Sequence, residues 1–127
     1  MTSIDEFPGW SDVVAWFGSA PSFHDAEVES IDLRRAPAPS VIRIHAWRTL
    51  KETDNNGHFR TDRHAIVSFI LTDIVRQDLT GWNEQNVLFN IHVTKERDEY
   101  CLRLEQSYGV AGEIIAKGVR LSVEPKT

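Results

Sequence analysis

The chain has 127 residues, 41% of them hydrophobic and 26% charged, a composition typical of one globular domain with its own core. The net charge of −5 argues against binding to nucleic acid, because phosphate recognition depends on clustered Lys and Arg side chains. A single cysteine, Cys101, excludes an intramolecular disulfide and a cysteine metal site. The chain has neither an apolar run near the roughly 20 residues of a membrane span nor a basic secretory start, so we expect a cytoplasmic protein with no membrane partner.

One short helix is predicted near the start of the chain. Residues 1–9 are mostly polar and should be irregular. Ser11 can cap a helix over residues 12–17, and Gly18 stands where a left-handed residue would end it. Two helical turns do not persist alone in water, so this segment must dock on the rest of the protein. We therefore expect Trp10 and Trp16 to lie in the core.

The segment 21–28, Pro-Ser-Phe-His-Asp-Ala-Glu-Val, joins this helix to the first predicted strand, over residues 24–35. Strand alternation predicts one face formed by His24, Ala26 and Val28. The opposite face would then hold Phe23, Asp25, Glu27 and Glu29. Further along, the apolar positions change from even to odd numbers, which predicts a β-bulge near Glu29 and Ser30.

We interpret Phe23, His24 and Asp25 as a structural motif. Phe23 and His24 would tie the helix to the sheet, with His24 donating to a backbone carbonyl and Asp25 bonding to the neighbouring backbone. This interpretation predicts that removal of His24 costs on the order of 1–3 kcal/mol of stability, the loss of a buried hydrogen bond.

Five further strands follow, over residues 41–50, 64–75, 87–94, 100–105 and 112–123. Asn56-Gly57 predicts a tight antiparallel hairpin between the second and third strands. The third strand is apolar on both faces, which indicates a central strand covered on both sides. In the fourth strand the inward side chains should be Val87, Phe89, Ile91 and Val93. In the second strand one face is formed by Ile42, Ile44 and Ala46, and in the fifth by Tyr100, Leu102 and Leu104. A second bulge or corner is predicted near Gly118.

Together these elements predict a single domain over residues 1–127, of class α+β and mainly antiparallel β. About six strands would form a curled sheet, a sandwich or a partial barrel, with one short N-terminal helix.

Residue patterns for catalysis or for cofactor and metal binding are weak, and we assign no catalytic residue, cofactor or metal. A metal site built across strands from His24, His45 and His92 is conceivable, but nothing in their spacing indicates one. The carboxylates at positions 25, 27 and 29 have a spacing near that of glycosidase pairs, although a solvated acidic strand face has the same pattern.

Two other hypotheses remain open at this point. A small-ligand-binding protein or unusual enzyme would have a pocket near His24 and Asp25, where an amide from the loop over residues 82–86 would converge with them. A structural subunit of an oligomer would instead expose a large apolar interface.

Cys101 has no local base to activate it and is expected to pack under the helix or a loop.

The chain resembles the immunity protein 50 family of bacterial polymorphic toxin systems. The likeness lies in Trp16-Phe17-Gly18 with the segment 21–28, in the segment 81–87 (Gly-Trp-Asn-Glu-Gln-Asn-Val), and in Tyr108-Gly109. It implies a small cytoplasmic protein that binds and neutralises a cognate toxin without catalysis of its own. The interface expected for such a protein is an acidic and aromatic surface composed of Glu27, Glu29, Trp82, Glu84 and Tyr108.

Overall fold

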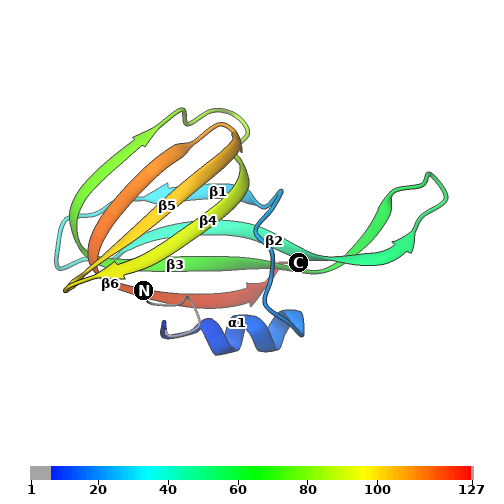
Figure 1. Cartoon of the computed structure of the whole chain (residues 1–127), viewed down its shortest axis with the longest axis horizontal. Helices are drawn as coiled ribbons and strands as arrows, with labels where there is room; N and C mark the ends of the chain where they lie inside the picture. The colour runs from blue at the N-terminus through cyan, green and yellow to red at the C-terminus, as the bar shows by residue number, and fades with distance from the viewer. Residues whose placement is uncertain (1–6, 127) are drawn as a thin grey trace.

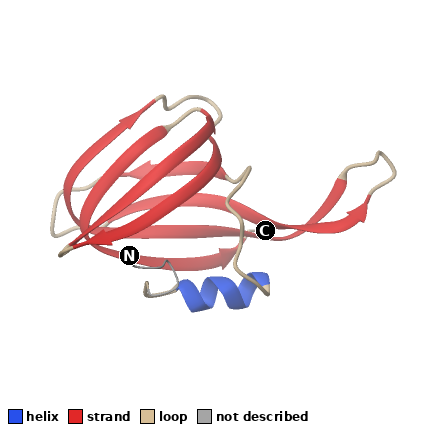
Figure 2. Cartoon of the chain, viewed as in Figure 1, coloured by secondary structure: helices blue, strands red, loops and turns tan. Residues whose placement is uncertain are grey.

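The computed structural model describes residues 7–126, which form one short helix and six antiparallel strands (Figures 1 and 2). The elements are α1 (Trp10–Phe17), β1 (Glu27–Asp32), β2 (Ser40–Thr53), β3 (Phe59–Thr80), β4 (Val87–Glu96), β5 (Glu99–Tyr108) and β6 (Ala111–Pro125). The strands close into a barrel in the order β1-β2-β3-β6-β5-β4. The predicted α+β class, mainly antiparallel with six strands and one N-terminal helix, is confirmed.

The core lies inside the barrel and follows the predicted alternation of β2 and β5. Ile42 pairs with Phe69 and Ile44 pairs with Val67, and all four side chains are buried. Leu102, on β5, is buried as expected for its face. Successive side chains of a strand point to opposite faces, and only one face of each strand is turned away from water, so every second side chain is buried.

Strand β3 is also covered on its outer face, as its apolar run predicts. Ile66 and Ser68 are buried although they point away from the barrel core formed by their neighbours Val67 and Phe69. On either side of β3, β2 and β6 pair with it and are linked across it by an ion pair between Arg43 and Glu124, 3.0 Å apart. The aliphatic stem of Arg43 therefore shields the outer face of β3 from water.

Helix α1 lies beneath β6 in Figure 1 and begins two residues earlier than predicted. Gly9, not Ser11, is its N-cap residue, and no side chain caps it. The N–H of Leu121 donates to the carbonyl of Pro8 over 2.8 Å, and this bond to β6 determines where the helix starts. At the other end Gly18 has the predicted left-handed conformation, with φ 81°.

The two tryptophans of the helix region differ in their surroundings. Trp10 is buried in the core as predicted, whereas Trp16 is only partly buried and packs against the core from its edge. The predicted irregularity of residues 1–9 falls mostly on residues 1–6, which lie outside the described residues; residues 7–9 form a bend and a turn. No helix among the described residues has the length and apolar character needed to cross a membrane.

Both predicted irregularities of the sheet are present. The pairing of β1 with β2 shifts between Val28 and Ser30, which is the expected bulge at Glu29. Near Gly118 the buried side of β6 changes from Ala116 to Val119, which makes the expected corner. The register itself shifts on the partner strand β3, between Ile74 and Arg76.

In β4 the predicted inward face is only partly correct. Ile91 and Val93 are buried, but Phe89 is exposed and Leu88 is buried in its place. The register of β4 with β5 shifts between Leu88 and Asn90, so Phe89 is an unpaired bulge residue. A bulge reverses the alternation on its N-terminal side, which is why the period-two pattern assigned the wrong face to Phe89.

The ends of β2 and β3 extend beyond the barrel as a projecting hairpin, the arm at the right of Figure 1. Its turn contains the predicted Asn-Gly pair, and Gly57 has φ 81°. The N–H of Asp54 donates to the carbonyl of His58 over 2.7 Å and closes the turn. The hairpin prediction is therefore confirmed, and the strands run further than the apolar residues alone indicated.

Candidate functional site

The loop over residues 81–86 is held in one conformation by the side chain of Asn86, which is only 5% exposed. Its Oδ1 accepts hydrogen bonds from the N–H groups of Asn83 (3.1 Å) and Val110 (2.9 Å), and its Nδ2 donates to the carbonyl of Asn83 over 2.9 Å. A buried amide with all these partners rigidifies the backbone around it. The loop therefore presents Trp82 from a fixed support.

A groove of about 690 Å³ separates this loop from β1 and brings together four of the five predicted interface residues. Glu27 and Glu29 line one wall, and Trp82 and Glu84 line the other. The fifth, Tyr108, connects to the same loop, because its hydroxyl accepts a hydrogen bond from Asn83 Nδ2 over 3.3 Å. We call this feature the acidic groove.

Trp82 is 54% exposed and borders a second hollow, of about 390 Å³, on its other side. Ile31 and Leu33 line that hollow from the β1 side, and Leu79 and Val110 line it from the other. We call it the apolar hollow. The sequence patterns did not predict this hollow. Leu33, an apolar residue just beyond the end of β1, is the signal that could have indicated it.

The acidic groove carries more negative than positive charge. Lys126, near the C-terminus, forms an ion pair with Glu29. Among the described residues no salt bridge neutralises Glu27 or Glu84, so these carboxylates remain available to a cationic group. Such a groove attracts basic partners and repels acidic ones.

The segment containing His24 and Asp25 turns before β1 begins, and the predicted alternation is wrong there. Asp25 has φ 70°, and its N–H donates to the carbonyl of Leu88 over 2.8 Å. Because the chain turns at Asp25, Phe23 lies with Ala26 and Val28 in the core, with its ring centroid 5.8 Å from that of Phe69.

His24 has a more exposed position than predicted. Its Nδ1 lies 3.3 Å from a carboxylate oxygen of Asp25, and both side chains are more than half exposed. Its ring meets the edge of Phe89 at a centroid distance of 5.1 Å. The side chain of His24 makes no buried hydrogen bond, so the helix is tied to the sheet by Phe23 and by the backbone of Asp25. Phe23 and the backbone of Asp25 therefore have the predicted structural role, whereas the side chain of His24 does not.

A cavity of about 380 Å³ does lie beside His24 and Asp25, lined on its other side by Trp47 and Arg48 of β2. The loop over residues 82–86 contributes nothing to it, so the predicted convergence with a loop amide is wrong. Phe17 and the backbone after α1 complete the walls. This cavity and the acidic groove are separate features.

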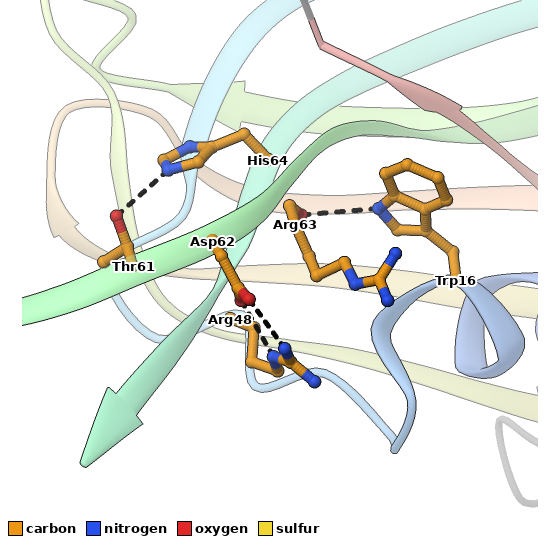
Figure 3. A network of polar contacts seen from close by, with 6 residues as sticks. All are labelled: Trp16, Arg48, Thr61, Asp62, Arg63 and His64. Carbon is orange, nitrogen blue, oxygen red and sulfur yellow. Dashed lines mark hydrogen bonds and ion pairs between the residues drawn. The ribbon is translucent and has the colours of Figure 1, made fainter. Parts of the chain in front are cut away.

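Arg48 anchors the root of the projecting hairpin next to this cavity (Figure 3). Its Nε and Nη2 donate to the two carboxylate oxygens of Asp62 over 2.8 and 2.6 Å, a bidentate pair. These hydrogen bonds lower the pKa of Asp62 and raise the pKa of Arg48. Beside them the guanidinium of Arg63 lies 5.5 Å from the ring centre of Trp16, and the Trp16 indole donates to the Arg63 carbonyl over 3.4 Å.

The three histidines of the conceivable metal site have separate partners. His45 Nε2 lies 2.9 Å from His64 Nδ1, His92 Nε2 lies 2.8 Å from a carboxylate oxygen of Glu105, and His24 contacts Asp25. Within residues 7–126 no three metal-ligating side chains gather at one point. The site considered across strands is therefore not formed.

His45 and His64 form a cluster with Trp47 that sequence reasoning missed. The two imidazoles share a hydrogen bond, and the indole of Trp47 stacks on His64 at a centroid distance of 5.7 Å. Burial lowers the pKa of His45, and the nearby charge of Lys126 lowers it further. The register that pairs β2 with β3 brings these residues together, which no local pattern indicates.

Cys101 lies between neighbouring strands rather than under the helix. Its Sγ donates to a carboxylate oxygen of Glu113 on β6 over 3.5 Å. Burial raises the pKa of the Cys101 thiol, and the hydrogen bond to Glu113 raises it as well. A thiol held in its protonated form is a poor nucleophile.

Comparison of the chain with protein-family models, with curated proteins and with solved structures gives no significant match. The choice between functions therefore depends on the acidic groove, on the cavity beside His24 and on the residues that line them.

Proposed function

We propose that this chain is an immunity-type binding protein, which neutralises a cognate bacterial toxin by direct contact at the acidic groove. The observation that carries the proposal is a half-exposed Trp82 on a rigid loop, which lines one groove together with Glu27 and Glu29 of β1. Exposed aromatic side chains on fixed supports are typical of the residues that dominate protein–protein affinity. The pre-ordered loop also lowers the entropy cost of binding.

The class of partner follows from two further considerations. The segments 16–18, 21–28 and 81–87 resemble the immunity protein 50 family, whose members are expected to bind toxins of polymorphic toxin systems. Toxins that attack nucleic acid carry basic surfaces, and the unneutralised carboxylates of Glu27 and Glu84 would steer such a surface toward the groove. The proposal assigns no catalysis to the chain itself.

The direct test is calorimetric titration of the protein with the toxin domain encoded by the neighbouring gene. Trp82→Ala should weaken binding by about 30-fold or more, the effect of removing a dominant interface residue. Phe59→Ala is the matched control, because Phe59 is an aromatic residue of comparable exposure, 63% against 54% for Trp82, on the projecting hairpin. Failure of the wild-type protein to bind the toxin domain would reject the proposal.

A second candidate function, binding of a small molecule, is favoured by the cavity beside His24 and Arg48. Its lining combines an imidazole, a carboxylate, a guanidinium and an indole, a mixture that suits a small polar ligand with an apolar part. Native mass spectrometry of the purified protein would reveal such a ligand. Ser22→Trp, which places an indole in the cavity, should release it. An empty cavity together with a stable toxin complex would favour the first proposal.

A further inference from the structure

The barrel is closed between β1 and β4 by a single residue pair, Glu27 with Val87. Two backbone hydrogen bonds flank this pair: the N–H of Leu88 donates to Ala26 over 2.9 Å, and the N–H of Val28 donates to Asn86 over 2.8 Å. Beyond them β1 continues to Asp32 and, among the described residues, pairs with β2 alone. The side of β1 that faces away from β2 is therefore an unpaired strand edge, and such edges readily accept another strand.

The backbone of Ile31 presents its N–H and C=O to this unpaired edge. Val28 and Ile31 pair with Ile44 and Ile42, which are two residues apart on β2. Positions two residues apart on an antiparallel strand direct their backbone groups to the same side. Because the N–H of Val28 points away from β2 toward Asn86, the N–H of Ile31 points away from β2 as well.

The unpaired edge begins at the end of the acidic groove, at Glu29, and continues along the apolar hollow. The acidic groove lies against β1 from Glu27 to Glu29, and the apolar hollow lies against Ile31 and Leu33. A strand added here would alternate its side chains like β1 itself. Those on the inward side, level with Ile31, would meet the apolar hollow, and those on the outward side would lie next to the acidic groove lined by Glu27 and Glu29.

We infer that the partner binds by adding an extended segment to the unpaired edge of β1, with large apolar residues alternating with Lys or Arg. This inference rests on the proposed function, because the toxin supplies the segment. Backbone pairing at a sheet edge provides affinity, and pockets for alternate side chains provide specificity. Charge complementarity selects basic outward residues, since Glu27 and Glu84 have no salt-bridge partner among the described residues.

Hydrogen exchange of the protein, free and bound to the neighbouring toxin domain, tests the backbone contact. The amide of Ile31 should exchange about tenfold more slowly, or better, in the complex, because it gains a hydrogen-bond acceptor. Asp32 is the matched control, since its N–H points to β2 and is already in the β1–β2 ladder. A complex that Trp82→Ala weakens, but in which Ile31 exchanges at its free rate, overturns strand addition and leaves the proposed function intact. Absence of any complex overturns both.

The basic character of the segment has its own test. Glu84→Lys should weaken the toxin complex by about tenfold or more, through charge repulsion at the groove. Glu96→Lys makes the same charge change at an exposed position at the end of β4, away from the groove, and should leave the affinity unchanged. Equal effects of the two substitutions would show that only net charge matters and would overturn a specific basic contact.

Discussion

Asn86 Oδ1 accepts a hydrogen bond from the N–H of Val110 over 2.9 Å and so fastens the Trp82 loop to the residue that precedes β6. Asn86→Ala would leave the buried Val110 amide without this acceptor and should lower the free energy of unfolding by about 1–3 kcal/mol. Urea denaturation measures the change. Gln85→Ala, at an exposed position of the same loop, should stay within about 0.5 kcal/mol of the wild type. Equal losses in both variants would contradict this account of the loop.

Gly109 lies against the same asparagine and should not tolerate a side chain. It has φ 87°, and an added Cβ would lie 2.5 Å from both Asn86 Oδ1 and the carbonyl oxygen of Gln85. Gly57 also has a positive φ, 81°, but an added Cβ there would meet nothing within 4 Å. Gly57→Ala should therefore cost about 1–2 kcal/mol for backbone strain alone. Gly109→Ala should cost about 1–3 kcal/mol more for overpacking, and thermal denaturation of the two variants compares them directly.

Phe23 and His24 are neighbours, but their removal should affect stability very differently. Phe23 is buried against Phe69, so Phe23→Ala should cost about 3–5 kcal/mol. His24 is exposed, and His24→Ala should change the free energy of unfolding by less than about 0.5 kcal/mol. Chemical denaturation of both variants measures the difference. A large loss in His24→Ala would show that the imidazole has a structural role that its exposure does not indicate.

Acidic pH should lower the free energy of unfolding through the protonation of His45. Burial and Lys126 lower its folded-state pKa below the ordinary value of 6.5, so the unfolded chain binds its proton more readily. The stability from a neutral His45 is therefore fully present above about pH 6.5 and declines as the pH falls toward the lowered pKa. We expect the free energy of unfolding to decrease between about pH 7.5 and about pH 5.5, as measured by urea denaturation.

His45→Gln should flatten this pH dependence, because it removes the imidazole whose protonation the folded state disfavours. His58→Gln is the control, since His58 is exposed at the turn of the projecting hairpin, and it should keep the wild-type slope. An unchanged slope in His45→Gln would assign the pH dependence to other groups.

Much of the fold follows from local patterns. The inward row from Ile42 to Ala46, the Asn56-Gly57 turn, the left-handed Gly18 and the bulge after Val28 were all predicted from residue periodicity and from the conformations that glycine allows. These features depend on neighbours in sequence, so the sequence is sufficient to define them.

The errors occur where contacts between distant residues overrule the local pattern. The helix starts at Trp10 because Pro8 bonds to Leu121, more than one hundred residues further along the chain. Phe89 is exposed because the pairing of β4 with β5 shifts at that point. In both cases backbone pairing with another strand decides the conformation, and periodicity contains no information about it.

The sequence by itself determined the number and approximate positions of the strands, where the hairpin turns, and that an acidic and aromatic set was available for binding. Only the tertiary structure decided that Glu27 and Glu29 line one groove together with Trp82 and Glu84. The physical reason is the pairing of Glu27 with Val87, which closes the barrel and sets the edge of β1 beside a loop that follows it by about fifty residues. That closure also leaves the remainder of β1 unpaired, next to the apolar hollow.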